Sequence, residues 1–329
     1  MQTSNKKYPI LISIQGITAS GKSEMAINLA KEIQRIGGSV WIINADSRQV
    51  YKNLDIGTAK IPGVWETRNN LEAFYYQDIP HFLIDYVNLD QDYGLVNYIT
   101  DFEKLTKRAD APDYFILVGG SGLYSKAIVT GERPLEVLPE FQKEFDTLKQ
   151  QLQELSLFKL QAKISPEEKV NINYSDFNNT RRLISRILNS TSVRKNWITN
   201  SKVKLEIVFD KVYQFGVKID EQIWEDKIKK RVEQWTLEND NLNPLIQETK
   251  KLEVLGPAKI QQLGFEYSTT WDYINGKFDK KEWQKRLLQA NRKYAKKQKT
   301  WLNKQPNVVW IENVKEIVGE GFILPTRQT

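Results

Sequence analysis

The stretch ILISIQGITASGKSE, residues 10–24, decides the fold of this chain. An apolar run typical of a buried strand leads into Gly16-x-x-x-x-Gly21-Lys22-Ser23, and apolar residues at helical spacing follow. A strand, a glycine-rich loop and a helix in this order form the context of a phosphate-binding loop. Glycines let backbone amides approach phosphate oxygens, lysine supplies positive charge, and the serine hydroxyl can bind a magnesium ion that bridges two phosphates. We therefore predict a phosphate site; a glycine-rich turn before an ordinary helix is the alternative.

Length and composition exclude several classes of protein. A chain of 329 residues exceeds the usual single-domain size, so a large α/β domain with a smaller one is expected. The absence of cysteine excludes disulfides and thiolate metal sites, and the single histidine, His81, is expected to be a structural or substrate-lining residue. No apolar run could span a bilayer and residues 1–10 lack the core of a signal peptide, so we expect a cytoplasmic protein. The net charge of +7 favours an anionic partner.

Further apolar runs predict strands at residues 39–44, 81–87, 114–118, 204–210 and 307–312. Residues 64–80 are expected to form a mixed loop or short helix, and residues 95–108 a helix. Helical periodicity between residues 131 and 197 predicts a helical insertion after the third or fourth strand. The predicted fold is a P-loop-class α/β fold, with a mainly parallel sheet flanked by helices. Its parts are a P-loop core, a helical insertion and a completion of the core with basic helices, at residues 1–132, 133–200 and 201–329.

A carboxylate, Asp46, directly follows the second predicted strand. The carboxyl ends of parallel strands gather at one edge of a sheet, so Asp46 is expected to face whatever the phosphate loop holds. The polar segment 47–63 is interpreted as an ordered functional loop, with a solvated linker as the alternative. Asp85 is either an acid beside the magnesium ion or a cap at a strand end.

The predicted helix over residues 279–304 is strongly basic. Its charged residues are Lys280, Lys281, Lys285, Arg286, Arg292, Lys293, Lys296, Lys297, Lys299 and Lys304, against Asp279 and Glu282. A charged helix face is usually a solvated face, but this imbalance also suits a surface that contacts RNA.

Five segments together resemble the tRNA dimethylallyltransferases, enzymes that prenylate an adenine beside the anticodon. They are GITASGKS, NADSRQVYKNLDIGTAK, IPHFLID, LVGGSGLY and NRKYAKKQKTWL, in the family's order over nearly the whole chain. The resemblance implies that the phosphate loop and Mg²⁺ hold the diphosphate of dimethylallyl diphosphate as a leaving group. It implies N6 of an adenine in the tRNA anticodon stem-loop as the acceptor. The chain lacks the cysteines of the family's zinc-finger extension, which implies a bacterial-type enzyme. We also expect it to act as a monomer and to have no membrane partner.

The resemblance also implies roles for individual residues. Asp46 matches the family's catalytic aspartate, which would accept a proton from N6. The diphosphate would be bound by Gly16, Thr18, Ala19, Ser20, Gly21, Lys22, Ser23, Lys227 and Arg231, with magnesium on Ser23. The tRNA would be bound by Ser47, Arg48, Gln49, Ser121, Arg181, Arg182, Arg186, Lys296 and Lys297.

Several positions depart from the family's pattern. Lys227 replaces an arginine thought to touch the diphosphate, and lysine supplies charge without the bidentate fork. In the insertion Asn179 stands where an aspartate is usual. Ser185 replaces an arginine and Arg186 is shifted by one residue, about 100° round a helix. The half that faces tRNA therefore departs more than the half that carries the chemistry.

Two other classes of function stay open. One is a prenyltransferase acting on a free adenine nucleotide, or a small-molecule kinase built on the same loop. The other is a phosphate-binding RNA adaptor without catalysis, which the change at Lys227 favours and the presence of Lys22 and Asp46 opposes.

Overall fold

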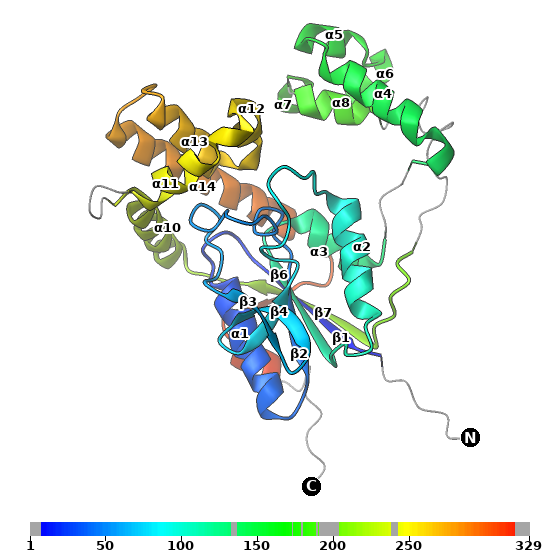
Figure 1. The fold of residues 1–329 in the computed structure, drawn as a ribbon, viewed down its shortest axis with the longest axis vertical. Coiled ribbons are helices and arrows are strands. Elements are labelled where there is room, and N and C mark those ends of the chain that lie inside the picture. Colours follow the sequence, from blue (N-terminus) through cyan, green and yellow to red (C-terminus); the bar gives the residue numbers. More distant parts are fainter. Residues whose placement is uncertain are drawn as a thin grey trace. The chain divides into compact units, whose positions relative to one another are not determined.

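The chain folds into two compact units in a computed structural model (Figure 1). The structure describes residues 8–132, 137–172, 174–178, 180–188, 190, 204–237 and 243–319. The first unit comprises Met1–Thr130 and Glu206–Thr329, and the second comprises Gly131–Leu205. The second unit is thus slightly longer than the predicted helical insertion at residues 133–200.

An eight-stranded sheet in the described residues forms the centre of the first unit. Its strands are β1 (Ile10–Gln15), β2 (Val40–Asn44), β3 (Val64–Arg68), β4 (Leu71–Tyr76), β5 (Ile79–Phe82), β6 (Tyr114–Gly119), β7 (Lys211–Val217) and β8 (Val309–Ile311). In the spatial order β3-β4-β5-β2-β6-β1-β7-β8, the strands from β5 to β8 are parallel and β3 and β4 are antiparallel additions at one edge. The predicted mainly parallel α/β sheet is confirmed.

Helices surround this sheet and build the second unit. The first unit contains α1 (Lys22–Arg35), α2 (Leu95–Thr106), α3 (Gly122–Thr130), α10 (Glu221–Thr236), α11 (Pro244–Lys251), α12 (Pro257–Leu263), α13 (Phe265–Ile274), α14 (Lys280–Leu302) and α15 (Val314–Gly319). The second contains α4 (Gln142–Gln153), α5 (Leu157–Ala162), α6 (Pro166–Val170), α7 (Tyr174–Phe177) and α8 (Thr180–Leu188). The described residues also include short 3₁₀ turns at Pro139–Phe141 and Glu253–Leu255. Among the described helices, none has the length and apolar character needed to cross a membrane.

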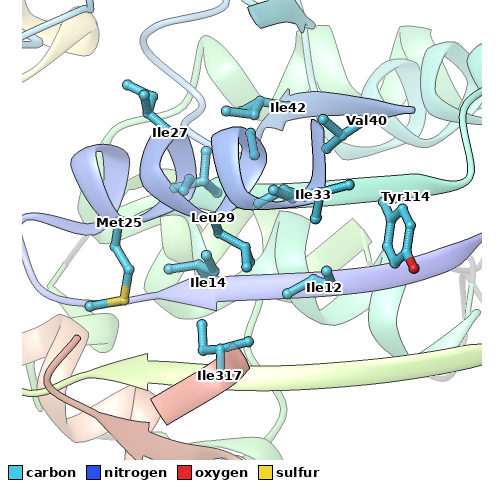
Figure 2. Packing of buried hydrophobic residues seen from close by; sticks show 14 of the residues in the cluster. Ile12, Ile14, Met25, Ile27, Leu29, Ile33, Val40, Ile42, Tyr114 and Ile317 are labelled. Carbon is cyan, nitrogen blue, oxygen red and sulfur yellow. The ribbon is translucent and has the colours of Figure 1, made fainter. Parts of the chain in front are cut away.

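The core around β1 explains why the phosphate loop is rigidly held at both ends. Every residue of β1, β2 and β6 is buried, as in central parallel strands covered on both faces. The apolar stripe of α1 packs on this sheet, with Leu29 and Ile33 beside Ile12 and Ile14 (Figure 2). The strand before the loop and the helix after it therefore share one core.

Residues 64–80 form an antiparallel hairpin, β3 and β4, that runs into β5, so the expected mixed loop or short helix is wrong. Asn69 and Asn70 form its turn with φ of 48° and 65°, the backbone of a two-residue hairpin turn that asparagine tolerates. The next strand ends at Phe82, earlier than predicted, because Leu83 adopts a φ of 57°.

The return of the chain to the sheet also differs from the prediction. Residues 204–210 are not a strand, and β7 begins at Lys211. With β3 and β4 counted, the insertion follows the sixth strand in chain order rather than the third or fourth. Its helices enclose a core of their own, made by Leu152, Leu160, Ile164, Leu183 and Leu188.

Candidate active site

The turn between β1 and α1 presents backbone amides to an anion. Gly21 has a φ of 90°, in the left-handed region that favours glycine, and Ala19 has a φ of 60°. Helix α1 begins directly at Lys22, and no side chain of the described residues caps it at Gly21. The first amides of this helix are therefore available to phosphate oxygens, with the helix dipole behind them.

A cavity adjoins this loop and receives side chains from distant parts of the chain. Its polar side chains are Thr18, Lys22, Ser23, Asn44, Asp46, Gln49, Thr58, His81, Arg231, Tyr294 and Gln298. Its apolar side chains are Ala19, Ile42, Ala59, Ile61, Ile84 and Val118, with Gly119 completing the wall. The cavity thus offers both an ionic region and an apolar surface to one ligand.

Two cations lie in this cavity. The ammonium of Lys22 donates to the carbonyl oxygen of Ile17 at 3.4 Å. Burial lowers the pKa of Lys22 to about 8, Arg231 adds to this by repulsion and Asp46 opposes it. Arg231 donates from Nη1 to Thr18 Oγ1 at 2.8 Å, and burial lowers its pKa although Glu266 and Asp46 favour its charge. Two partly desolvated cations beside free amides form a site for a polyanion.

Asp46 is held in a fixed orientation. Its Oδ1 accepts the backbone N–H of Arg48 at 2.9 Å, and its own backbone N–H donates to Asn44 Oδ1 at 3.0 Å. Asn44 Nδ2 donates in turn to the carbonyl oxygens of Asp46 and Leu83, at 3.0 and 2.8 Å. Within the described residues Asp46 Oδ2 has no hydrogen-bond partner, so it can accept a proton or a hydrogen bond from a ligand.

A second carboxyl group, Glu266 at the start of α13, lies in the electrostatic field of the same residues. Burial raises its pKa to about 7, and the negative charge of Asp46 adds to this, while Arg48 and Arg231 act in the opposite direction. Sequence reasoning did not single out Glu266.

The turn after β6 packs directly against the segment that carries Asp46. The backbone N–H of Ser47 donates to Ser121 Oγ at 2.9 Å, and the two hydroxyls lie 3.2 Å apart. A Cβ on Gly119 would lie 2.2 Å from the carbonyl carbon and oxygen of Ala45, so only glycine permits this approach. The structure therefore brings Ser47 and Ser121 together beside Asp46.

The loop over residues 47–63 is ordered by a buried carboxylate from α11. Glu248 accepts the backbone N–H groups of Asp55, Ile56 and Gly57 at 2.9, 2.7 and 3.0 Å, and the hydroxyl of Tyr267 at 2.7 Å. Within the loop, Gln49 Nε2 donates to the carbonyl oxygen of Thr58 at 3.0 Å. The loop thereby presents Gln49 to the cavity.

The remaining diphosphate candidates do not line this cavity. Ser20, Gly21 and Lys227 border more open pockets on another side of the loop. Lys227 Nζ lies 3.8 Å from where a Cβ on Gly21 would stand, and Ser20 Oγ is buried without a hydrogen-bond partner in the described part of the chain. A Cβ on Gly16 would lie 2.5 Å from that same Oγ. Four residues of the loop line the cavity with Arg231, namely Thr18, Ala19, Lys22 and Ser23, and Lys227 does not.

The RNA-contact candidates occupy three regions. Ser47, Arg48, Gln49 and Ser121 lie near Asp46. Lys296 and Lys297 are exposed on α14. On α8 of the second unit Arg182 is exposed and Arg186 is half-buried, whereas the side chain of Arg181 and the whole of Asn179 fall outside the described residues.

His81 and Asp85 have different surroundings. His81 lines the cavity, its Nδ1 lies 2.9 Å from the carbonyl oxygen of Ile79, and burial lowers its pKa to about 4, so the ring is neutral at pH 7. Asp85 accepts the ammonium of Lys60 at 2.6 Å and does not line the cavity. In the described part of the chain no three His, Asp or Glu residues form a group suited to a metal.

Helix α14 supplies two cavity residues that sequence reasoning did not assign, Tyr294 and Gln298. They are four residues apart, which places both on one face of the helix. Trp224 of α10 was also missed; its Nε1 donates to the carbonyl oxygen of Thr18 at 2.9 Å. The segment NRKYAKKQKTWL contained the signal, because its uncharged polar residues recur at helical spacing within a basic run.

The chain resembles a family of known proteins in both sequence and structure. A family model described as IPP transferase matches residues 49–305. The tRNA dimethylallyltransferase of Bacillus velezensis is 30% identical, over 94% of this chain and 92% of that protein. The tRNA dimethylallyltransferase 1 of Citrifermentans bemidjiense is 30% identical, over 95% and 94%.

Solved structures give the same result for the fold. The full-length tRNA isopentenylpyrophosphate transferase from Bacillus halodurans superposes with a TM-score of 0.59 at 26% identity, covering 94% of this chain and 93% of that one. A eukaryotic dimethylallyltransferase acting on tRNA superposes with a TM-score of 0.62 at 19% identity, covering 92% and 74%. The second likeness concerns the fold alone.

Proposed function

The chain belongs to the IPP transferase family, and on this premise we propose that it transfers a dimethylallyl group from dimethylallyl diphosphate to tRNA. The acceptor is N6 of the adenine beside the anticodon, and inorganic diphosphate is released. The observation that carries the proposal is the presence of Lys22, Arg231 and Asp46 in one cavity. Lys22 and Arg231 can stabilise an anionic leaving group, and Asp46 can accept a proton.

The donor binds through its diphosphate. The phosphate-loop amides, Lys22 and Arg231 offset the negative charge that grows on the diphosphate as the bond from C1 to oxygen breaks. Ser23 lines the cavity with Lys22, and its hydroxyl would be the protein ligand of a magnesium ion bound with the diphosphate. When bound, magnesium adds positive charge at the leaving oxygens.

The apolar side chains of the cavity suit the dimethylallyl group. Ile42, Ile84 and Val118 are buried in its wall, and Ile61 belongs to the same lining. Neutral His81 adds no charge to this wall. Burial of a branched five-carbon chain against these residues would exclude water from the reacting carbon.

Asp46 acts on the acceptor. The lone pair of N6 is delocalised into the adenine ring, so removal of an N6 proton by a carboxylate makes the nitrogen a better nucleophile. As the bond from N6 to C1 forms, the proton goes to Asp46 and the electron pair of the C1–oxygen bond leaves with the diphosphate. The free Oδ2 of Asp46 is the atom that takes the proton.

The tRNA binds through residues near Asp46 and through basic residues on α8 and α14. Its proposed contacts are Ser47, Arg48, Gln49, Ser121, Arg181, Arg182, Arg186, Lys296 and Lys297. The reactive adenine must leave its stack in the anticodon loop to reach Asp46, as in other enzymes that modify a base. We propose a monomer as the active species.

The test is transfer of labelled dimethylallyl from its diphosphate to unmodified tRNA whose anticodon-adjacent adenine lies in an A-A-A run. Free AMP is assayed in parallel. Label in tRNA supports the proposal. Label only in AMP would assign the protein to free nucleotides, and label in neither would leave the cavity to another phosphate ligand.

Replacement of Asp46 by asparagine separates an enzyme from an RNA adaptor. We expect a loss of transfer of about 10²- to 10⁴-fold, the usual contribution of a general base, with tRNA binding retained. The matched control is Asp113→Asn, because Asp113 accepts hydrogen bonds from Ser39 and lies outside the cavity. Equal transfer by Asp46→Asn and wild type would remove Asp46 from the mechanism.

A further inference from the structure

Helix α14 reaches the cavity through a side chain that has no assigned role. Gln298 is half-buried and lines the cavity, whereas its neighbours Lys296, Lys297 and Lys299 are exposed. The same helix therefore presents cations to solvent and one amide to the reacting groups.

The Gln298 amide uses both of its ends. Its Oε1 accepts the backbone N–H of Thr18 at 2.7 Å, and its Nε2 donates to the carbonyl oxygen of Gly120 at 3.1 Å. Glutamine is suited to this place because it carries an acceptor and donors on one rigid amide. A Cβ on Gly120 would lie 2.4 Å from Nε2, so the turn has room for the amide only because residue 120 is glycine.

These two partners belong to different halves of the reaction site. Thr18 is part of the phosphate loop, and its hydroxyl receives a hydrogen bond from Arg231. Gly120 lies between Gly119 and Ser121, in the turn that packs against Ala45 and Ser47 on either side of Asp46. Gln298 thus joins the loop that holds the donor to the turn that supports the general base.

We propose that Gln298 is a positioning residue that sets the distance between the bound diphosphate and Asp46. This inference rests on the proposed function. The transfer needs C1 of the donor and N6 of the acceptor in contact and aligned, and a displacement of about 1 Å can cost about 100-fold in rate. Without the Gln298 bridge, each half still binds its own ligand, but the two are no longer fixed relative to each other.

The experiment compares two substitutions of Gln298 with one matched control. Gln298→Met keeps the length of the side chain and removes both hydrogen bonds, and Gln298→Ala removes the side chain as well. The control is Gln284→Met, on the same helix, because Gln284 is also half-buried and donates to Thr236 Oγ1 at 2.8 Å outside the cavity. Any general effect of losing a glutamine from α14 appears in the control.

The measured quantities are kcat and KM for dimethylallyl transfer to tRNA, and the affinity for inorganic diphosphate by calorimetry. For Gln298→Met we expect kcat to fall about 10- to 100-fold with KM for tRNA within about twofold. Diphosphate affinity should fall about fivefold, because the Thr18 segment loses one hydrogen-bond partner. Gln284→Met should match wild type in all three.

Three results would overturn the proposal. The first is a kcat for Gln298→Met equal to that of Gln284→Met. The second is a rise in KM for tRNA with kcat unchanged, which would make Gln298 an RNA contact. The third is a diphosphate affinity in Gln298→Met that equals or exceeds that of wild type, which contradicts the role of Gln298 in ordering the phosphate loop. This third measurement remains decisive even if wild type transfers nothing and the proposed function fails.

Discussion

At the scale of single residues, the position of the Lys22 ammonium limits the pH range of anion binding. Burial disfavours its charged form, and Arg231 adds repulsion in the same cavity, whereas Asp46 favours the charge. In the protein without ligand, Lys22 therefore loses its proton near pH 8 instead of near 10.5.

We expect the affinity for inorganic diphosphate to be full below pH 8 and to fall as the pH rises through about 8, since the bound anion needs the protonated amine. Lys22→Arg should shift this fall to higher pH, because a guanidinium keeps its charge up to about pH 12. Calorimetric titrations at a series of pH values measure the diphosphate affinity of both proteins. An affinity that stays level through pH 8 in wild type would show that the Lys22 charge does not hold the anion.

The residues that sequence reasoning missed at the site share one property, which is that their partners are far away in the chain. Gln298 bonds to a residue 280 positions earlier, and Glu248 to residues 191 to 193 positions earlier. A local pattern carries no information about such pairs. Lys22 and Asp46 were found because the loop and the strand end that place them are local features of the sequence.

At the scale of elements, the loop over residues 47–63 depends on a helix from the C-terminal third of the chain. Glu248 is buried, and its two oxygens together accept three amides and one hydroxyl. An ionised carboxylate is acceptor-only and can satisfy all four donors, whereas a glutamine brings donors of its own to the same place.

Glu248→Gln should lower the free energy of unfolding by about 1 to 3 kcal/mol, the cost of leaving buried donors without partners. It should also speed hydrogen exchange at the amides of Asp55, Ile56 and Gly57. Tyr267→Phe is the milder comparison, since it removes one hydrogen bond at about 1 kcal/mol. Slow exchange at these amides in Glu248→Gln would mean that the loop is ordered by other contacts.

The elements that could be predicted from the sequence are strands buried on both faces and helices whose apolar spacing continues over several turns. β1 and β6 are buried along their whole length and are mostly apolar, and α14 keeps its apolar stripe over most of its length. The hairpin of β3 and β4 was missed because most of β3 is exposed, so its side chains lack the apolar pattern.

At the scale of the whole molecule, the two units have separate hydrophobic cores. The chain leaves and re-enters the second unit at adjacent residues: Leu205 donates its N–H to the carbonyl oxygen of Gly131 at 2.8 Å, and Glu132 and Lys204 form an antiparallel bridge. A short linker can therefore close the first unit without straining its sheet.

A protein in which residues 133–203 are replaced by a short glycine-serine linker should fold and bind inorganic diphosphate with wild-type affinity. Its affinity for tRNA should drop, with a shallower dependence on salt, because phosphate contacts from the insertion are lost. Gel-shift assays at several salt concentrations and calorimetry measure both properties. Loss of diphosphate binding in a folded deletion protein would show that the insertion also supports the phosphate loop.

The chain enters the second unit at Gly131 and leaves it at Leu205, and these two residues are hydrogen-bonded to each other, which bears on how the protein can evolve. A domain attached at one narrow seam can be traded, lengthened or altered without a matching change in its host. Mutations in the second unit can then change its surface while the cavity of the first unit stays the same. Asn179 and Ser185, which depart from the family's pattern, belong to the second unit, whereas Lys22 and Asp46, which keep it, belong to the first.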